Sequence, residues 1–368
     1  MKARAAPARM HPKPVAWLAG TAPAVHGSFD ASTAVDSRFR PEDVLDFSAN
    51  GNVIGPVPGV AAAIAKVDPS IYPDRGALAL RTALAARYAV PIDQVVVGDG
   101  STELIWAVAR AFLAPGDATV VLGPTYGEYA AASAACGARA ESCLACPPGS
   151  PINIDLIGRM VGERSPVVVW LCHPNNPTGA GFPIDALEAL IDRYPATLFA
   201  VDEAYVSFSD ELASALPLID KGNVVVLRSM TKDAALAGFR IGYVVTDEDI
   251  ADALRRVQPP WSVSSVAQAA ALASLEDSGH AELVKQAVAA AREHLEVGLQ
   301  RLGYAPYPSL ANFVLVPVGD GVRVSRGLLA HGIAVRDCTS FGLPQCIRIG
   351  VRSIADQERL LAAMAELG

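Results

Sequence analysis

Short apolar runs alternate with longer segments of helical spacing between about residues 92 and 245. The expected strands are Gln94–Val97, Ala118–Leu122, Ala138–Cys143, Val167–Leu171, Thr197–Val201, Val224–Arg228 and Arg240–Val245. The expected helices are Ala77–Tyr88, Thr102–Leu113, Ile184–Ile191 and Ile250–Val257. Several of the strands are almost continuously apolar, as is typical when helices cover both faces of a sheet. The pattern therefore predicts a doubly wound α/β domain with a mostly parallel sheet.

The pattern changes after residue 262. The alanine-rich segment Val263–Leu302 predicts a connecting helix. Beyond it, strand-like pieces (Asn312–Val316, Ile333–Arg336 and Cys346–Gly350) precede a helix at Ala355–Leu367, which indicates a smaller C-terminal α+β domain. We therefore expect an N-terminal extension or arm over residues 1–45, a large domain over 46–262, a connecting helix over 263–302 and a small domain over 303–368.

Composition and charge argue against several classes of function. Of the 368 residues, 51% are hydrophobic and 18% are charged, and the net charge is -8. A mildly acidic chain lacks the basic surface that binds nucleic acid or an anionic membrane, so neither partner is expected. No apolar run approaches the roughly 18 residues of a transmembrane helix. Val15–Leu18 is too short for a signal-peptide core.

The six cysteines show no disulfide pattern. Cys143 and Cys146 form a solitary CxxC without a second pair or a histidine cluster, so no metal site is expected there. Reduced thiols in a cytoplasmic enzyme are the simpler interpretation.

Lys232 is the first candidate for chemistry. Alone, a lysine after a strand would be interpreted as a surface residue. Here Ser229 and Thr231 precede it and Arg240 follows it, and hydroxyls with a guanidinium make a site for a dianion. Burial beside Ala234 would lower the pKa of the lysine, which suits bond formation with a carbonyl group.

A second phosphate-binding candidate follows the strand at Gln94–Val97. Gly100, Ser101 and Thr102 open a helix, where backbone amides attract phosphate and glycine permits close approach. An ordinary capped turn with Ser101 as the N-cap is the alternative. The lysine motif favours phosphate binding.

Polar side chains at three further strand ends complete the set. Asp202 ends an apolar strand, with Tyr205 three residues later, and Asn176 lies in a turn after Val167–Leu171. Tyr126 begins a helix, where it can stack on a flat ring or simply pack in the core. No histidine accompanies Asp202 at ligand spacing, so no metal is expected.

Together these groups are those needed to hold pyridoxal phosphate (PLP). The lysine bonds to the aldehyde, the carboxylate keeps the pyridine nitrogen protonated, an amide and a phenol contact the ring oxygen, and hydroxyls and a guanidinium hold the phosphate. In the small domain, Arg336 and Arg348 can hold a substrate carboxylate or phosphate, whereas Arg352 is expected to be structural.

Along residues 26–368 the chain resembles the class I/II aminotransferase family of fold-type I PLP enzymes, through NPTG, DEAY and the S-x-T-K…R block. The resemblance implies that Lys232 is the Schiff-base lysine, Asp202 the partner of the pyridine nitrogen, and Tyr126 the stacking ring. The implied contacts to the ring oxygen are Tyr205 and Asn176, and those to the phosphate are Gly100, Ser101, Thr102, Ser229, Thr231 and Arg240. Tyr72 matches a tyrosine that reaches the phosphate of a partner subunit, so a homodimer with shared active sites is implied. Arg348 matches the substrate-anion arginine.

Within the family, the chain is most similar to the histidinol-phosphate aminotransferase branch, and there to threonine-phosphate decarboxylases. The segments that carry this likeness are His26-Gly27, LDFSAN at Leu45–Asn50, PPWSV at Pro259–Val263 and VRSIADQERLLAAM near the C-terminus. The branch implies substrate-phosphate contacts for His26 and Arg336, and a position near the substrate carboxylate for Asn50. Asp233 and the loop Gly51–Gly55 depart from the family pattern near the substrate.

These residues serve two reactions of an amino-acid substrate. The bond at Cα that stands perpendicular to the cofactor ring is the one that breaks, and the grip of Arg336 and Arg348 on the substrate anions decides which bond that is. The sequence slightly favours decarboxylation of a phosphorylated or otherwise anionic amino acid. The alternative is an aminotransferase that exchanges the amino group with a 2-oxo acid. A non-catalytic PLP-binding regulator is disfavoured, because Lys232 is retained and no basic DNA-binding segment is present.

Overall fold

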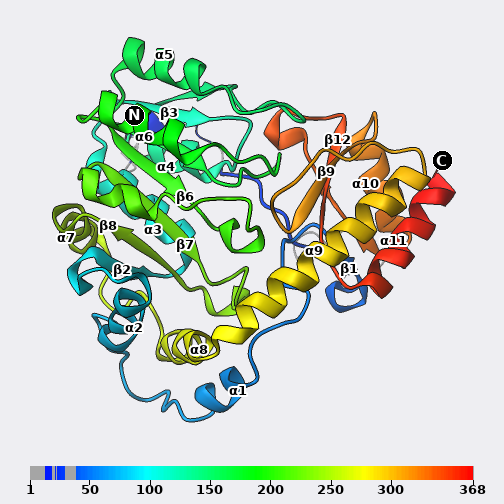
Figure 1. The fold of residues 1–368 in the computed structure, drawn as a ribbon, viewed down its shortest axis with the longest axis horizontal. Helices are drawn as coiled ribbons and strands as arrows, with labels where there is room; N and C mark the ends of the chain where they lie inside the picture. The colour runs from blue at the N-terminus through cyan, green and yellow to red at the C-terminus, as the bar shows by residue number, and fades with distance from the viewer. Residues whose placement is uncertain (1–12, 19–20, 22, 30–38, 368) are drawn as a thin grey trace, which may run out of the picture.

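The computed structural model describes residues 13–18, 21, 23–29 and 39–367. Most of the expected N-terminal arm, including residues 1–12 and 30–38, lies outside the described residues. Figure 1 shows a large sheet flanked by helices, a smaller α/β part beside it, and the long helix α9 running between the two. No helix in the described ranges is long and apolar enough to cross a membrane.

The large sheet has seven strands in the order β2-β8-β7-β6-β5-β3-β4. Its strands are β2 (Val95–Gly98), β3 (Ala118–Leu122), β4 (Arg139–Cys143), β5 (Val168–Cys172), β6 (Leu198–Asp202), β7 (Val224–Ser229) and β8 (Gly242–Thr246). The strands from β7 to β4 are parallel, whereas β8 is antiparallel to both of its neighbours. The expected doubly wound, mostly parallel sheet is therefore confirmed.

Helices cover both faces of this sheet, as the apolar strands predict. The helices around the sheet are α1 (Gly59–Ile64), α2 (Leu78–Tyr88), α3 (Gly100–Phe112), α4 (Glu128–Ala135), α5 (Ile154–Arg164), α6 (Ile184–Arg193), α7 (Glu248–Val257) and α8 (Ser265–Glu276). Val96 belongs to the apolar core that also contains residues of α3, α4 and α7, whereas its neighbours Val95 and Val97 belong to the core on the other face, with residues of α2, α5, α6 and α8. Because successive side chains of a strand point to opposite faces of the sheet, β2 contributes to both apolar cores.

The smaller part is built from both ends of the described chain. It contains β1 (Leu45–Asp46), β9 (Phe313–Pro317), β10 (Ile333–Ala334), β11 (Arg336–Asp337), β12 (Cys346–Gly350), α9 (Ser278–Arg301), α10 (Gly321–Ala330) and α11 (Ile354–Leu367). Strands β11, β12 and β9 form an antiparallel sheet, and β1 pairs in parallel with β10. Leu45 and Phe47 join the core of this part, although Leu45 was expected in the N-terminal arm and Phe47 in the large domain.

Two expected elements are interrupted. The segment Val263–Leu302 is two helices, because Asp277 accepts hydrogen bonds from the amides of Gly279 and His280 and so caps a new helix. The expected strand Ile333–Arg336 is divided into β10 and β11, which pair with different strands.

Candidate active site

The polar residues predicted at the strand ends meet at one edge of the large sheet. In the sheet register Cys172 at the end of β5 lies opposite Asp202 at the end of β6, and Ser229 ends β7 beside them. A cavity at this edge is lined by Ser101, Thr102, Tyr126, Tyr129, Cys172, Asn176, Asp202, Ala204, Tyr205, Thr231, Lys232 and Arg240. The fold therefore gathers most of the predicted cofactor residues in one place, as expected at the carboxyl edge of an α/β sheet.

Lys232 and Asp202 have pKa values shifted toward neutrality. Burial lowers the pKa of Lys232 to about 8, helped by the charges of Arg348 and Arg240 and opposed by that of Asp202. Burial raises the pKa of Asp202 to about 6, opposed by hydrogen bonds from the Tyr129 hydroxyl and the Ala204 amide and by the charge of Lys232. Near neutral pH the lysine has an accessible neutral amine, and the carboxylate is a buried anion suited to a cationic partner.

Tyr129 is a functional residue that sequence reasoning missed. Its hydroxyl donates to Oδ2 of Asp202 at 2.8 Å, and its side chain is fully buried. Its ring stacks on Trp170 with 5.5 Å between centroids and 14° between planes. The sequence places the start of a helix at Tyr126, but α4 begins two residues later at Glu128, so Tyr126 and Tyr129 do not share a helix face. The partner of Tyr129, Asp202, lies 73 residues away in the sequence, and no local pattern marked the pair.

Several of the residues expected to hold the phosphate lie close together: Gly100, Ser101, Ser229, Thr231 and Arg240. The hydroxyl oxygens of Ser229 and Thr231 are 2.6 Å apart. Gly100 has a φ of +77°, and a Cβ there would lie 2.6 Å from Nη2 of Arg240. A Cβ at Gly242 would lie 2.7 Å from the amide nitrogen of Ser101. Close backbone approach at the N-terminus of α3 suits a phosphate.

The alternative of an ordinary capped turn is wrong in its detail. Asp99 occupies the N-cap position without a side-chain cap, and Gly100 is the first helical residue, so Ser101 is not the cap. The Ser101 side chain instead lies in the lining of the cavity. The residues present therefore fit PLP.

Contacts at the junction with the small part place Asn50, Asn176 and Arg348 beside these residues. Asn50 donates to the Tyr205 hydroxyl at 3.0 Å. The Arg348 guanidinium donates to Oδ1 of Asn176 at 2.5 Å and to the Ser48 carbonyl at 2.6 Å. Within the described residues, Nε of Arg348 and Oδ1 of Asn50 are buried without hydrogen-bond partners, so a polar ligand would satisfy them.

Arg336 lies directly opposite Arg348 in the β11–β12 register. Its guanidinium donates to the carbonyls of Val25 and His26 at 2.8 and 2.9 Å, and to the Ser340 hydroxyl at 2.7 Å. Two adjacent guanidinium groups repel each other and favour an anion between or beside them.

Two further predicted residues lie away from the cavity. Tyr72 is 76% exposed and contacts Trp261 at 4.9 Å between ring centroids, so it does not reach the cavity of its own chain. Arg352 donates to Asp356 at 3.0 Å, in keeping with a structural role.

Comparison with known proteins agrees with this geometry. The family model for aminotransferases of class I and II matches residues 42–365. A protein of Halobacterium salinarum named histidinol-phosphate aminotransferase is 37% identical over 342 residues, which cover 89% of this chain and 92% of the relative.

Solved structures show the same fold. The histidinol-phosphate aminotransferase of Sinorhizobium meliloti in complex with pyridoxal-5'-phosphate superposes with a TM-score of 0.80 at 28% identity, covering 87% of this chain and 89% of the other. The L-threonine-O-3-phosphate decarboxylase of Porphyromonas gingivalis has a TM-score of 0.78 at 24% identity, covering 88% and 99%. At that identity the second likeness concerns the fold alone.

Proposed function

Because the chain belongs to the class I and II aminotransferase family, we propose that it is a PLP-dependent aminotransferase for a phosphorylated amine. The amino acceptor would be a 2-oxo acid. The observation that carries the proposal is a single cavity holding Lys232 and Asp202, next to the paired guanidinium groups of Arg348 and Arg336. Transamination replaces the decarboxylation that the sequence slightly favoured, because the relative at 37% identity is named as an aminotransferase.

Different residues of the chain would hold different parts of the cofactor. Bound PLP supplies an aldehyde that joins to amines and a ring that accepts electrons. Lys232 would hold the aldehyde carbon, Asp202 the pyridine nitrogen, and Tyr205 and Asn176 the ring oxygen. The face of Tyr126 would pack on the ring. The phosphate would lie among Gly100, Ser101, Thr102, Ser229, Thr231 and Arg240.

Lys232 is also the proposed proton carrier. Transamination requires a base that removes the proton from the substrate Cα and returns it at the adjoining carbon. With its pKa lowered to about 8, Nζ of Lys232 is neutral in a useful fraction of molecules near neutral pH. Arg348 would orient the substrate so that the Cα–H bond faces this nitrogen.

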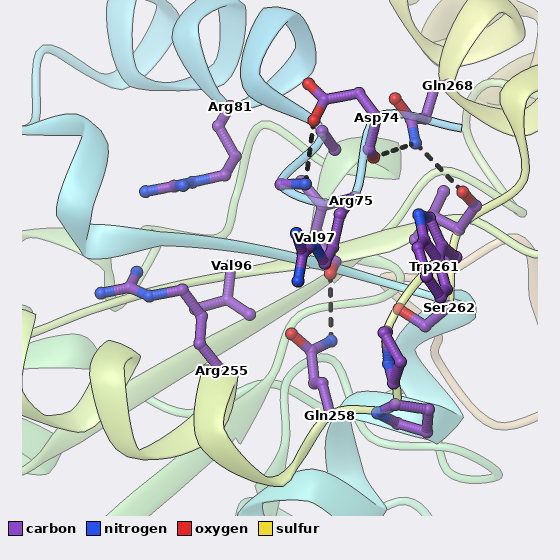
Figure 2. Close-up of a pocket in the computed structure, with 15 residues that line it drawn as sticks. Asp74, Arg75, Arg81, Val96, Val97, Arg255, Gln258, Trp261, Ser262 and Gln268 are labelled. Atoms are coloured by element: carbon purple, nitrogen blue, oxygen red, sulfur yellow. Dashed lines mark hydrogen bonds between the residues drawn. The ribbon is translucent and has the colours of Figure 1, made fainter. Parts of the chain in front are cut away.

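We also propose a homodimer in which a second copy covers the hollow of Figure 2. Trp261 lines this hollow and has a positive φ of 58°, and its ring contacts that of Tyr72 with 4.9 Å between centroids. Both side chains are exposed, as are the apolar side chains of Ile71 and Leu78 close by in the sequence. Gln258 connects the hollow to the residues expected to hold the phosphate, since its amide donates to the carbonyl of Val97 and to Glu103 in the first turn of α3. An apolar patch of this kind is typical of an interface between proteins.

The test of function compares two substrates. Purified protein loaded with PLP is incubated with histidinol phosphate plus 2-oxoglutarate, and separately with O-phospho-L-threonine. Formation of glutamate in the first reaction supports the proposal. Release of CO2 in the second, without glutamate in the first, would establish decarboxylation instead. Absence of both would refute the assignment.

Oligomeric state and location are tested separately. Sedimentation of the PLP-loaded protein should give twice the 38.3 kDa mass of one chain. The cytoplasmic location stays a prediction from the cysteine pattern, with all six cysteines free.

A further inference from the structure

Glu128, at the start of α4, is a buried carboxylate that the chemistry above does not use. Its Oε1 lies 2.8 Å from Nε2 of His26, and its Oε2 accepts a hydrogen bond from the Trp106 indole at 2.7 Å. Its side chain is 9% exposed. The hydrogen bond with His26 lowers the pKa of Glu128, although burial opposes this. Trp106 on α3 therefore fixes a carboxylate whose other oxygen is available to His26.

His26 lies between the cofactor residues and the anion-binding arginines. Its ring is 5.6 Å from the ring of Tyr126, which lines the cavity. Its carbonyl accepts a hydrogen bond from Arg336. The next residue, Gly27, packs so closely that a Cβ would collide with the Ser48 carbonyl and lie 3.3 Å from Nη2 of Arg348. The backbone at His26 and Gly27 is therefore held beside Arg336 and Arg348, and the imidazole, with 48% of its side chain exposed, lies next to the ring of Tyr126.

We propose that Glu128 is a positioning residue for substrate specificity, which holds His26 so that its imidazole binds the phosphate of the substrate. This inference rests on the proposed function and deepens it. Within the described part of the chain, Nδ1 of His26 has no hydrogen-bond partner. A doubly protonated imidazole can donate from Nε2 to Glu128 and from Nδ1 to a phosphate at the same time.

The test is the variant Glu128→Gln, which keeps the shape and the acceptor for Trp106 but removes the charge. Steady-state kinetics are measured with histidinol phosphate and with unphosphorylated histidinol. We expect KM for histidinol phosphate to rise at least about tenfold, the equivalent of one charge-assisted hydrogen bond. Both kcat and the KM for histidinol should stay unchanged. Trp106→Phe should shift the same KM in the same direction by a smaller factor.

A matched control lies elsewhere in the chain. His294 and Glu358 form a pair with the same 2.8 Å separation between α9 and α11, away from the cavity. Glu358→Gln removes the same charge and should leave both substrates unaffected. If Glu128→Gln impairs both substrates equally, the residue only anchors the N-terminal segment and the proposal is wrong.

A binding measurement separates this inference from the proposed function. Calorimetric titration of the PLP-loaded protein with inorganic phosphate should show binding that weakens at least about tenfold in Glu128→Gln. Unchanged phosphate affinity in the variant, or no phosphate binding by the wild type, would overturn the role of Glu128. A wild type that binds phosphate in this way but does not turn over histidinol phosphate would refute only the proposed function.

Discussion

Replacing Tyr129 by phenylalanine should change how cofactor affinity depends on pH. The substitution keeps the ring that stacks on Trp170 and removes the hydroxyl that donates to Asp202. Burial already raises the pKa of Asp202 to about 6, and this hydroxyl is the largest opposing contribution. A hydrogen bond to a charged group is worth about 1.5–3 kcal/mol, equivalent to about 1–2 pKa units. The pKa of Asp202 should therefore be higher still in the variant.

The direction of this pH dependence follows from which form of Asp202 binds the protonated pyridine nitrogen. Only the carboxylate form does so, and as the pH falls the variant loses its carboxylate at a higher pH than the wild type. The ratio of dissociation constants for PLP, variant over wild type, should be about 10- to 100-fold below pH 6 and approach one above pH 9. At high pH, where Asp202 is a carboxylate in both proteins, the titration of Lys232 is the same in both and cancels in the ratio.

The assay is absorbance titration of each apoprotein with PLP between pH 5.5 and 9. Tyr243→Phe is the control, because Tyr243 is a buried tyrosine whose hydroxyl pairs with Tyr88 instead of Asp202. A ratio for Tyr129→Phe that stays constant over this range, or that stays near one at pH 5.5, would refute the coupling between Tyr129 and Asp202.

Four other expectations follow from the same structure. Lys232→Ala should show no absorbance band of a Schiff base between PLP and the protein, and its turnover should fall at least about 100-fold. In the wild type, the rate of PLP uptake by the apoprotein should rise about tenfold between pH 7 and 9, because the neutral amine of Lys232 forms around its lowered pKa of about 8. Gly27→Ala should raise the substrate KM without changing PLP affinity, since the added methyl group would meet the Ser48 carbonyl; unchanged kinetics would contradict this packing. Trp170→Ala removes a fully buried ring and should lower the free energy of unfolding in urea by about 3–5 kcal/mol.

The strands of the large sheet were predictable because a strand that is buried on both faces has a nearly continuous run of apolar residues. The apolar runs at Ala118–Leu122 and Cys346–Gly350 match β3 and β12 at both ends. An apolar run does not encode strand direction, so the antiparallel β8 was not predicted. A helix was expected to begin at Tyr126, and α4 begins two residues later at Glu128; its run of alanines gives only a weak contrast between its faces, so its bounds were not predicted.

The candidate site was predictable where its chemistry is local in the sequence. Lys232 stands among Ser229, Thr231 and Arg240, and side chains at strand ends point to a common edge. Tyr129 was missed because its partner, Asp202, lies 73 residues away. Glu128 likewise contacts His26, which is 102 residues away in the sequence. Such pairs exist only after the sheet and the N-terminal segment have come together, and no spacing rule predicts them.

The pairing of β1 with β10 affects the order in which the polypeptide can fold as it is synthesised. The large sheet uses one continuous stretch, from Val95 in β2 to Thr246 in β8, so its strands can associate once that stretch has left the ribosome. Leu45 must wait for Ile333, and Arg348 emerges later still. The nascent chain can therefore assemble the sheet edge that carries Lys232 and Asp202 before Arg336 and Arg348, the proposed substrate-binding arginines, have been synthesised. With these proposed roles, the part of the site that selects the substrate is the last to form during synthesis.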